Sequence, residues 1–326
     1  MDDRRDAEEG LFGALIGDGR SLLILSGLSL IIVGAFAVFL AATGRFLPHD
    51  TAFLGMTAEE LCAVHGCRIV HFMQHDRVSF GGALIAAGTM YVWLAEFPLK
   101  QGAAWAWWLF AASGLLGFGS FLAYLGYGYL DTWHGVATLF LLPIFIGGMV
   151  LTRRLVKETR GIAALFKPSS KIDFRTRQGL GRLCLLATGG GMVAGGLTIM
   201  IVGMTSVFVP QDLSFMRVSV EEIQAINVRL MSLIAHDRAG FGGGLATCGL
   251  TVLFTVWCAQ PSKSLWQALC IAGCVGFGSA IGIHPAVGYV DLSHLAPALA
   301  GAVFFVIGLT LSFGPMAGAR RQSATA

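Results

Sequence analysis

Eight apolar runs, each close to the roughly 20 residues that a helix needs to cross a bilayer, dominate this sequence of 326 residues. Only 13% of the residues are charged and 55% are hydrophobic, whereas a soluble domain is nearer to one quarter charged. The sequence therefore predicts an all-α, polytopic membrane protein. The expected transmembrane helices cover roughly 21–43, 78–97, 104–126, 134–152, 182–208, 240–259, 264–284 and 295–315.

The second half of the chain repeats short motifs of the first half. HDRVSFGG at 75–82 returns as HDRAGFGG at 236–243, and GYLDTWH at 128–134 returns as GYVDLSH at 288–294. LPHDTAFLGM and VPQDLSFMRV, and two copies of GFGS, form further pairs. Four spans in each half, an even number, predict two parallel four-helix repeats related by a pseudo-twofold axis along the membrane normal. The expected boundaries are an N-terminal tail (1–20), repeat 1 (21–152), a basic linker (153–181), repeat 2 (182–315) and a C-terminal tail (316–326).

The distribution of basic residues predicts the orientation of the chain. Sixteen of the 22 Lys and Arg residues lie on the side that holds both termini and the linker, and six Arg lie on the other side. Cytoplasmic loops carry the excess of Lys and Arg, so we expect a multi-pass protein of the inner (plasma) membrane with cytoplasmic termini. The bilayer is its expected surroundings, and a net charge of +3 is too small to suggest a nucleic-acid partner.

All eight histidines fall on the predicted outer side or at its helix ends, and four of them belong to the repeated motifs. His75 and His236 open the HDR motifs, whereas His134 and His294 close the Asp-x-x-His motifs. The second and fourth spans of a unit both run inward from the outer surface. We therefore expect His75 to meet His134, and His236 to meet His294, at one depth within each unit.

The acidic and basic neighbours of these histidines allow two interpretations. Asp76 and Asp237 stand where a helix is expected to begin, so they can be N-caps, and Arg77 and Arg238 can form ion pairs or snorkel. Alternatively, the carboxylates are metal ligands or orient the imidazoles. The candidate metal ligands are His75, Asp76, Asp131, His134, His236, Asp237, Asp291 and His294.

The first outer loop carries additional candidate ligands. If this loop is helical, Cys67, His71 and His75 recur every four residues on one face, which suggests accessory metal ligands together with Cys62. The same two cysteines can instead form a disulfide, because the outer compartment is oxidising.

Eight spans in two units, with one histidine near the outer end of the second and fourth helix of each, resemble the architecture of the haem A synthase family. That resemblance implies haem ligation by His75, His134, His236 and His294, and the family also has a cysteine pair in its first outer loop, where Cys62 and Cys67 stand here. The family's Glu-x-x-His-Arg pattern is replaced by Met-Gln-His-Asp-Arg before the first helix entry.

Three functions fit these patterns. The first is a membrane protein that binds haem or a transition metal (iron, copper or zinc) and serves as an oxidoreductase, with a redox partner or a membrane complex. The second is a proton-coupled secondary transporter in which histidine titrates. The third is a non-catalytic subunit or assembly factor whose charged clusters are structural ion pairs.

Overall fold

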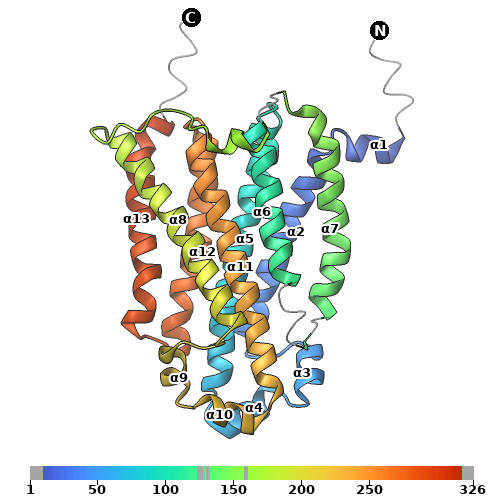
Figure 1. The fold of residues 1–326 in the computed structure, drawn as a ribbon, viewed down its shortest axis with the longest axis vertical. Coiled ribbons are helices and arrows are strands. Elements are labelled where there is room, and N and C mark those ends of the chain that lie inside the picture. Colours follow the sequence, from blue (N-terminus) through green and yellow to red (C-terminus); the bar gives the residue numbers. More distant parts are fainter. Residues whose placement is uncertain (1–9, 123–127, 130–131, 158–160, 318–326) are drawn as a thin grey trace, which may run out of the picture.

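A computed structural model describes residues 10–122, 128–129, 132–157 and 161–317. The described part is helical and contains no strand, and it has eight helices long and apolar enough to cross a membrane, as predicted (Figure 1). These are α2 (Arg20–Ala42), α5 (Arg68–Leu94) with its π-helical extension η1 (Ala95–Leu99), α6 (Ala104–Leu122), α7 (Thr132–Thr152), α8 (Arg177–Met204), α11 (Arg229–Cys258), α12 (Lys263–Val287) and α13 (Leu292–Ala317). Short helices are α1 (Leu11–Ile16), α3 (Pro48–Leu54), α4 (Ala58–His65), α9 (Pro210–Met216) and α10 (Val220–Ile226).

Two of the long helices form the centre of the bundle. In the apolar window of α5 with η1, 83% of the residues are buried, and 72% are buried in that of α11, against 17–33% in the other six helices. Apolar side chains on the outer helices, such as Ile32 and Leu139, are exposed. A helix that is apolar all round and exposed suits lipid, so α5 and α11 are enclosed by six helices that face the membrane.

Contacts between small residues place α5 close to two helices from different halves of the sequence. A Cβ on Gly81 would lie 2.6 Å from the carbonyl oxygen of Gly34 in α2. On the other side, a Cβ on Gly82 would lie 1.7 Å from the hydroxyl of Ser279 in α12. Small residues permit such close approach in membranes, so the two glycines of the first FGG motif seat α5 between α2 and α12.

The second FGG motif seats α11 in the same manner. A Cβ on Gly242 would lie 2.6 Å from the carbonyl oxygen of Gly196 in α8, and one on Gly243 would lie 2.1 Å from the hydroxyl of Ser120 in α6. Each central helix therefore packs against the first long helix of its own half and against the GFGS serine of the other half.

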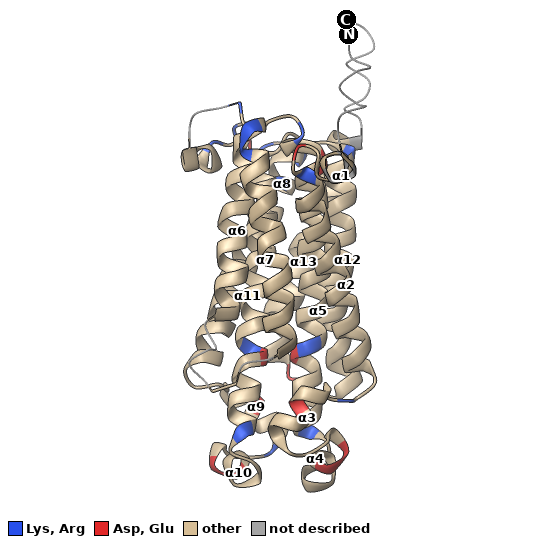
Figure 2. Ribbon diagram, turned by 90° about the vertical axis from the view of Figure 1, so that its right-hand side faces the viewer, with Lys and Arg blue, Asp and Glu red and all other residues tan. Residues whose placement is uncertain are grey.

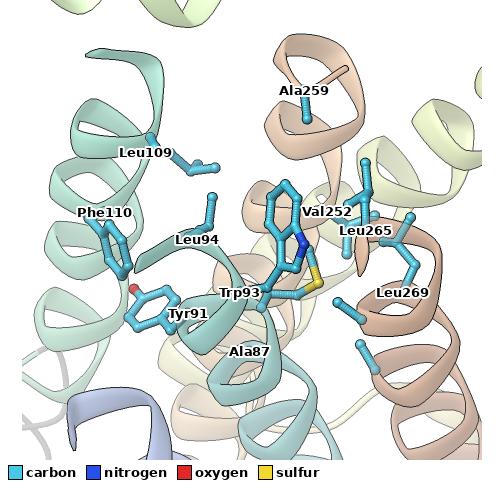
Figure 3. Close-up of a cluster of buried hydrophobic side chains, with 14 of the residues drawn as sticks. Ala87, Tyr91, Trp93, Leu94, Leu109, Phe110, Val252, Ala259, Leu265 and Leu269 are labelled. Carbon is cyan, nitrogen blue, oxygen red and sulfur yellow. The ribbon is translucent and has the colours of Figure 1, made fainter. Parts of the chain in front are cut away.

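Aromatic and aliphatic side chains fill the bundle near the end at which α6 and α12 begin (Figure 3). The ring centroids of Tyr91 and Phe110 lie 4.8 Å apart. Trp93 is buried near Leu265, and its indole N–H donates to the Ser264 hydroxyl at 3.1 Å. These contacts join α5 to both α6 and α12.

A second apolar cluster lies at the opposite end, below the level of the transmembrane bundle. It combines α3, α4, α9 and α10 with the first turns of α5 and α11, and its fully buried members include Phe72, Leu61, Ile223 and Leu233. Figure 2 shows long uncharged stretches of helix between the Lys and Arg near α1 and the charges of both signs near α3 and α9. This cluster forms a small folded cap.

The cap explains why the predicted starts of two helices were wrong. We expected helices from 78 and 240, which allowed Asp76 and Asp237 to be N-caps as one of two interpretations, but α5 begins at Arg68 and α11 at Arg229. The 32 residues of α5 and η1 span about 48 Å, more than the roughly 30 Å of hydrocarbon. Both aspartates therefore lie inside helices, and hydropathy alone did not detect the turns buried in the cap.

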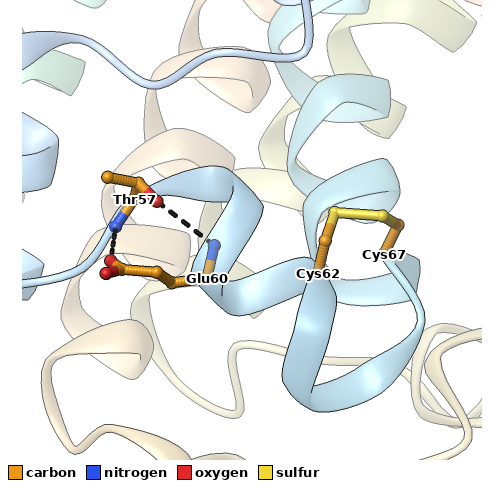
Figure 4. Close-up of a disulfide and its surroundings, with 4 residues drawn as sticks. All are labelled: Thr57, Glu60, Cys62 and Cys67. Atoms are coloured by element: carbon orange, nitrogen blue, oxygen red, sulfur yellow. Dashed lines mark hydrogen bonds between the residues drawn. A yellow bond between two sulfur atoms is a disulfide. The ribbon is translucent and has the colours of Figure 1, made fainter.

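Cys62 and Cys67 are joined by a disulfide at the corner between α4 and α5 (Figure 4). The preceding turn carries a capping box, in which the Glu60 N–H donates to the Thr57 hydroxyl at 3.2 Å and the Thr57 N–H donates to the Glu60 carboxylate at 2.7 Å. Since both thiols are consumed in the bond, the prediction that they are accessory metal ligands is wrong.

Candidate functional site

Three imidazoles from three helices converge at the end of the transmembrane bundle that adjoins the folded cap. One ring nitrogen of each of His75, His284 and His294 lies within 4.8 Å of the others. The Nε2 atoms of His75 and His284 are 3.1 Å apart, and the His294 ring centroid lies 5.4 Å from the centroids of both other rings. Nineteen residues separate His75 from Leu94, a rise of about 28 Å, so the group lies near the edge of the hydrocarbon layer on the side of the cap.

Hydrogen bonds at the far side of two rings fix their tautomers. Nδ1 of His75 is 3.0 Å from the Asp76 carboxylate, and Nδ1 of His284 is 2.7 Å from the backbone carbonyl of Tyr289. Both oxygens only accept hydrogen bonds, so each Nδ1 carries a proton and each neutral ring has its lone pair on Nε2. When both rings are neutral, two lone pairs therefore face each other, and either a metal ion or one added proton would relieve this arrangement.

The Asp76 carboxylate belongs to a buried network of charges. Arg238 donates to Asp212 and lies 3.6 Å from Asp76. The Tyr289 hydroxyl donates to Asp212 at 2.8 Å, and its ring stacks on His294 with the centroids 4.4 Å apart. Burial and the nearby Asp212 raise the pKa of Tyr289, so the phenol keeps its proton. The network positions both His75 and His294.

A matching network also joins the two central helices. Arg77 forms ion pairs with Asp50 at 2.9 Å and with Asp237 at 2.8 Å, and the Tyr129 hydroxyl donates to Asp50. Nδ1 of His236 lies 3.2 Å from Asp237. Each arginine thus pairs with one aspartate of its own half and approaches one from the other half.

His134 and His236 form a second imidazole pair at the end of this network. Nδ1 of His134 lies 3.0 Å from Nε2 of His236, and the ring centroids are 4.9 Å apart. Nδ1 of His134 can donate a hydrogen bond to the lone pair on Nε2 of His236. Two neutral rings therefore explain this contact without a cation between them. This distinguishes the pair from the three-histidine group.

The predicted pairing of histidines within each half was wrong. We expected His75 beside His134 and His236 beside His294, but His75 contacts His284 and His294, whereas His134 contacts His236. The reason is that α5 packs against α12, and α11 against α6, through the glycine and serine contacts described above. The order of the helices along the chain therefore does not predict which helices pack against each other.

The remaining predicted ligands that the structure describes do not join the three-histidine group. Asp291 is exposed and accepts hydrogen bonds from the Ser293 hydroxyl and the His294 N–H, which lower its pKa. It is thus the cap of α13. Asp131 lies outside the described residues. His71 is half-buried and outside the group.

A haem held between two of these rings does not fit the geometry. Axial ligands on opposite faces of an iron lie about 4 Å apart, twice a metal–nitrogen bond. The two closest nitrogen pairs are 3.1 and 3.0 Å apart, and the His75 and His284 rings meet at 66°. Neighbouring ligands of a single ion, by contrast, lie about 3.0–3.4 Å apart.

Several residues of the site were not identified from the sequence. His284 was not among the predicted ligands, because it lies in no repeated motif. Asp50, Asp212, Tyr129 and Tyr289 do lie in repeated motifs. Their recurrence was a signal that could have placed them in the network.

Comparisons with protein-family models, with curated proteins and with solved structures found no significant match to this chain. Function is therefore inferred from the geometry and chemistry of the site.

Proposed function

We propose that this multi-pass membrane protein binds one transition-metal ion through His75, His284 and His294. The observation that supports this most directly is the 3.1 Å contact between two Nε2 atoms whose protons are held elsewhere. A shared ion replaces the repulsion between the lone pairs with two metal–nitrogen bonds. Asp76 and the Tyr289 carbonyl would orient the imidazoles, as outer partners of metal-bound histidines commonly do.

The balance of buried charge also favours a cation. The two networks hold four described carboxylates (Asp50, Asp76, Asp212 and Asp237) and two guanidiniums (Arg77 and Arg238). Isolated buried charge is costly, and each network has one carboxylate more than it has guanidiniums, next to His75 in one network and next to His49 and His236 in the other. A metal ion at the three histidines would supply positive charge to the network that contains Asp76.

The ligand set limits the ion and its chemistry. Imidazole ligands suit copper, iron, zinc and nickel, and three histidines leave a further coordination position for a substrate, as in catalytic sites. Bound copper or iron would supply oxidation–reduction chemistry, and bound zinc would supply Lewis-acid chemistry. We favour the redox ions and a membrane oxidoreductase.

The same contact supports a second candidate, a proton-coupled transporter. One added proton between the two Nε2 atoms would also relieve the repulsion, and histidine titrates in the range where such coupling is useful. In that case metal addition would leave the protein unloaded, and a pH gradient would drive uptake into liposomes.

Metal content tests the proposal. Purified full-length protein, stripped with chelator and incubated with copper, iron or zinc, should retain about one ion per chain by elemental analysis. His284→Ala and His294→Ala should each reduce retained metal at least tenfold, because two imidazoles bind far more weakly than three. His71→Ala and His134→Ala serve as matched controls and should retain it. An unloaded wild-type protein would overturn the proposal.

We further propose that the two four-helix halves are duplicated units and that the histidine end faces away from the cytoplasm. The disulfide at that end supports this orientation, because disulfides persist in oxidising compartments. The paired networks, each with Arg, two Asp and Tyr, support the duplication.

Thiol labelling tests the orientation. In right-side-out vesicles, an impermeant maleimide should label Cys62 and Cys67 only after reduction. A Cys62→Ser/Cys67→Ser variant should show no such labelling. Reduction-dependent labelling found only in inside-out vesicles would reverse the orientation.

A further inference from the structure

A cavity of about 720 Å³ extends from the three histidines into the membrane region between α5, α8, α11, α12 and α13. Along α8 its lining runs from Ala187 to Val202, and along α13 from Ser293 to Phe305. These stretches rise by about 22 and 18 Å, which is over half of the hydrocarbon thickness. The volume falls in the range of small-molecule sites, and the shape is long.

The cavity opens sideways toward the lipid. Gly191 and Thr198 of α8, and Pro297 and Ala300 of α13, line it and are exposed. The two helices touch near their inner ends, where a Cβ on Gly181 would lie 3.0 Å from the Gly308 carbonyl. They diverge toward the histidine end (Figure 1). A molecule dissolved in the membrane can therefore enter without crossing water.

The outer end of the cavity carries buried polar atoms that lack a hydrogen-bond partner. The Ser79 hydroxyl, on a residue that is 2% exposed, has no partner. Nε of Arg238 and Oδ2 of Asp76, on residues that are 4% and 1% exposed, form an ion pair with each other at 3.6 Å, which is too long for a hydrogen bond. Unpaired buried polar atoms are costly and indicate a missing partner. Ser79 lies one helical turn inside His75 on the same face of α5, so this polar end adjoins the histidines.

Among the described residues, the corresponding space in the first half holds a smaller cavity of about 60 Å³, lined by Tyr91 and Phe121 among others. When the two halves are aligned on their repeated motifs, Val252 stands in place of Tyr91, Ala280 in place of Phe121, and Ser79 in place of Gly240. The large cavity and its hydroxyl therefore arise from substitutions that distinguish the two halves, which favours a ligand site over a general packing defect.

We propose that this cavity binds a lipid-soluble molecule with a neutral, oxygen-bearing head, a quinone or quinol by chemical class. Arg238 and Ser79 would donate to its carbonyl oxygens, and Asp76 would accept from a quinol hydroxyl. An anionic head is disfavoured, because Asp76 and Asp212 already surround Arg238. The role of this molecule as substrate of the metal ion depends on the proposed function, whereas its binding does not.

Saturable binding of a benzoquinone with a ten-carbon tail tests this inference. Full-length protein in lipid nanodiscs, corrected with empty nanodiscs, should bind about one probe per chain. Gly195→Leu should reduce the affinity at least tenfold, because Gly195 lines the cavity and its added Cβ would meet nothing within 4 Å. Gly190→Leu is the matched control, since Gly190 has equal space in the same helix but does not line the cavity, and it should change the affinity less than twofold.

Two further measurements separate the possible outcomes. Ser79→Ala should weaken binding about three- to tenfold, consistent with one lost hydrogen bond. Dodecanoate should bind at least tenfold more weakly than the quinone, and a preference for it would assign the cavity to acyl chains and overturn the inference. Equal binding to Gly195→Leu and wild type would also overturn it. Metal retained by Gly195→Leu shows that loss of quinone binding is separate from failure of the metal site.

Discussion

Arg238→Met should lower the free energy of unfolding by about 3–5 kcal/mol, because it leaves buried carboxylates without their counter-charge. Arg238 is 4% exposed and is paired with Asp212, while Asp76 lies 3.6 Å away. Methionine preserves much of the side-chain volume, so the loss would report charge rather than a cavity. Unfolding in mixed detergent and SDS micelles measures the change.

Two variants show whether this loss comes from the ion pair. Arg175→Met removes one exposed positive charge and should change stability by less than about 0.5 kcal/mol. Adding Asp212→Asn to Arg238→Met should recover part of the loss, since the uncompensated carboxylate is then neutral. If the double variant is as unstable as the sum of the single variants, Arg238 does not act through Asp212.

The eight helices long and apolar enough to cross a membrane followed from hydropathy, but the starts of two of them and the short helices between them did not. A run of apolar residues shows where a helix crosses lipid. The segment from Arg68 to Arg77 is mixed in polarity, and its apolar residues Ile69 and Phe72 are buried in the cap. That burial depends on α9 and α10, which are more than a hundred residues away, so a local pattern could not reveal it.

The chemistry of the site could be predicted more fully than its pairing. The repeated HDR and Asp-x-x-His motifs identified His75 and His294, and they identified Arg238 as an ion-pair candidate. The partners of these side chains depend on which helices pack together. That packing is set by the contact of Gly82 with Ser279 and by the contact of Gly243 with Ser120. Those residues stood in the quoted FGG and GFGS repeats. The residues that make these contacts were visible in the sequence. No local pattern, however, showed that the FGG motif of one half packs against the GFGS motif of the other half.

Gly243→Ala should destabilise the bundle by about 1–3 kcal/mol, the usual effect of overpacking. An added Cβ would lie 2.2 Å from the Ser120 Cβ and 2.1 Å from its hydroxyl, so α6 and α11 would have to separate. Because His134 and His236 lie on α7 and α11 at the same end, the 3.0 Å contact between them should lengthen too. Unfolding in mixed micelles measures the stability.

Swapping the smaller and the larger residue at the contact between Gly243 and Ser120 distinguishes overpacking from a change in helix propensity. Gly243→Ala combined with Ser120→Gly should recover most of the loss, since the methyl group then occupies the space left by the serine side chain. Gly190→Ala, in open space in α8, should instead stabilise the protein by about 0.5–1 kcal/mol, the ordinary gain from replacing a helical glycine. A Gly243→Ala variant as stable as Gly190→Ala would show that the halves are not held at this distance. The crossed arrangement of the histidines, which depends on that contact, would then need another cause.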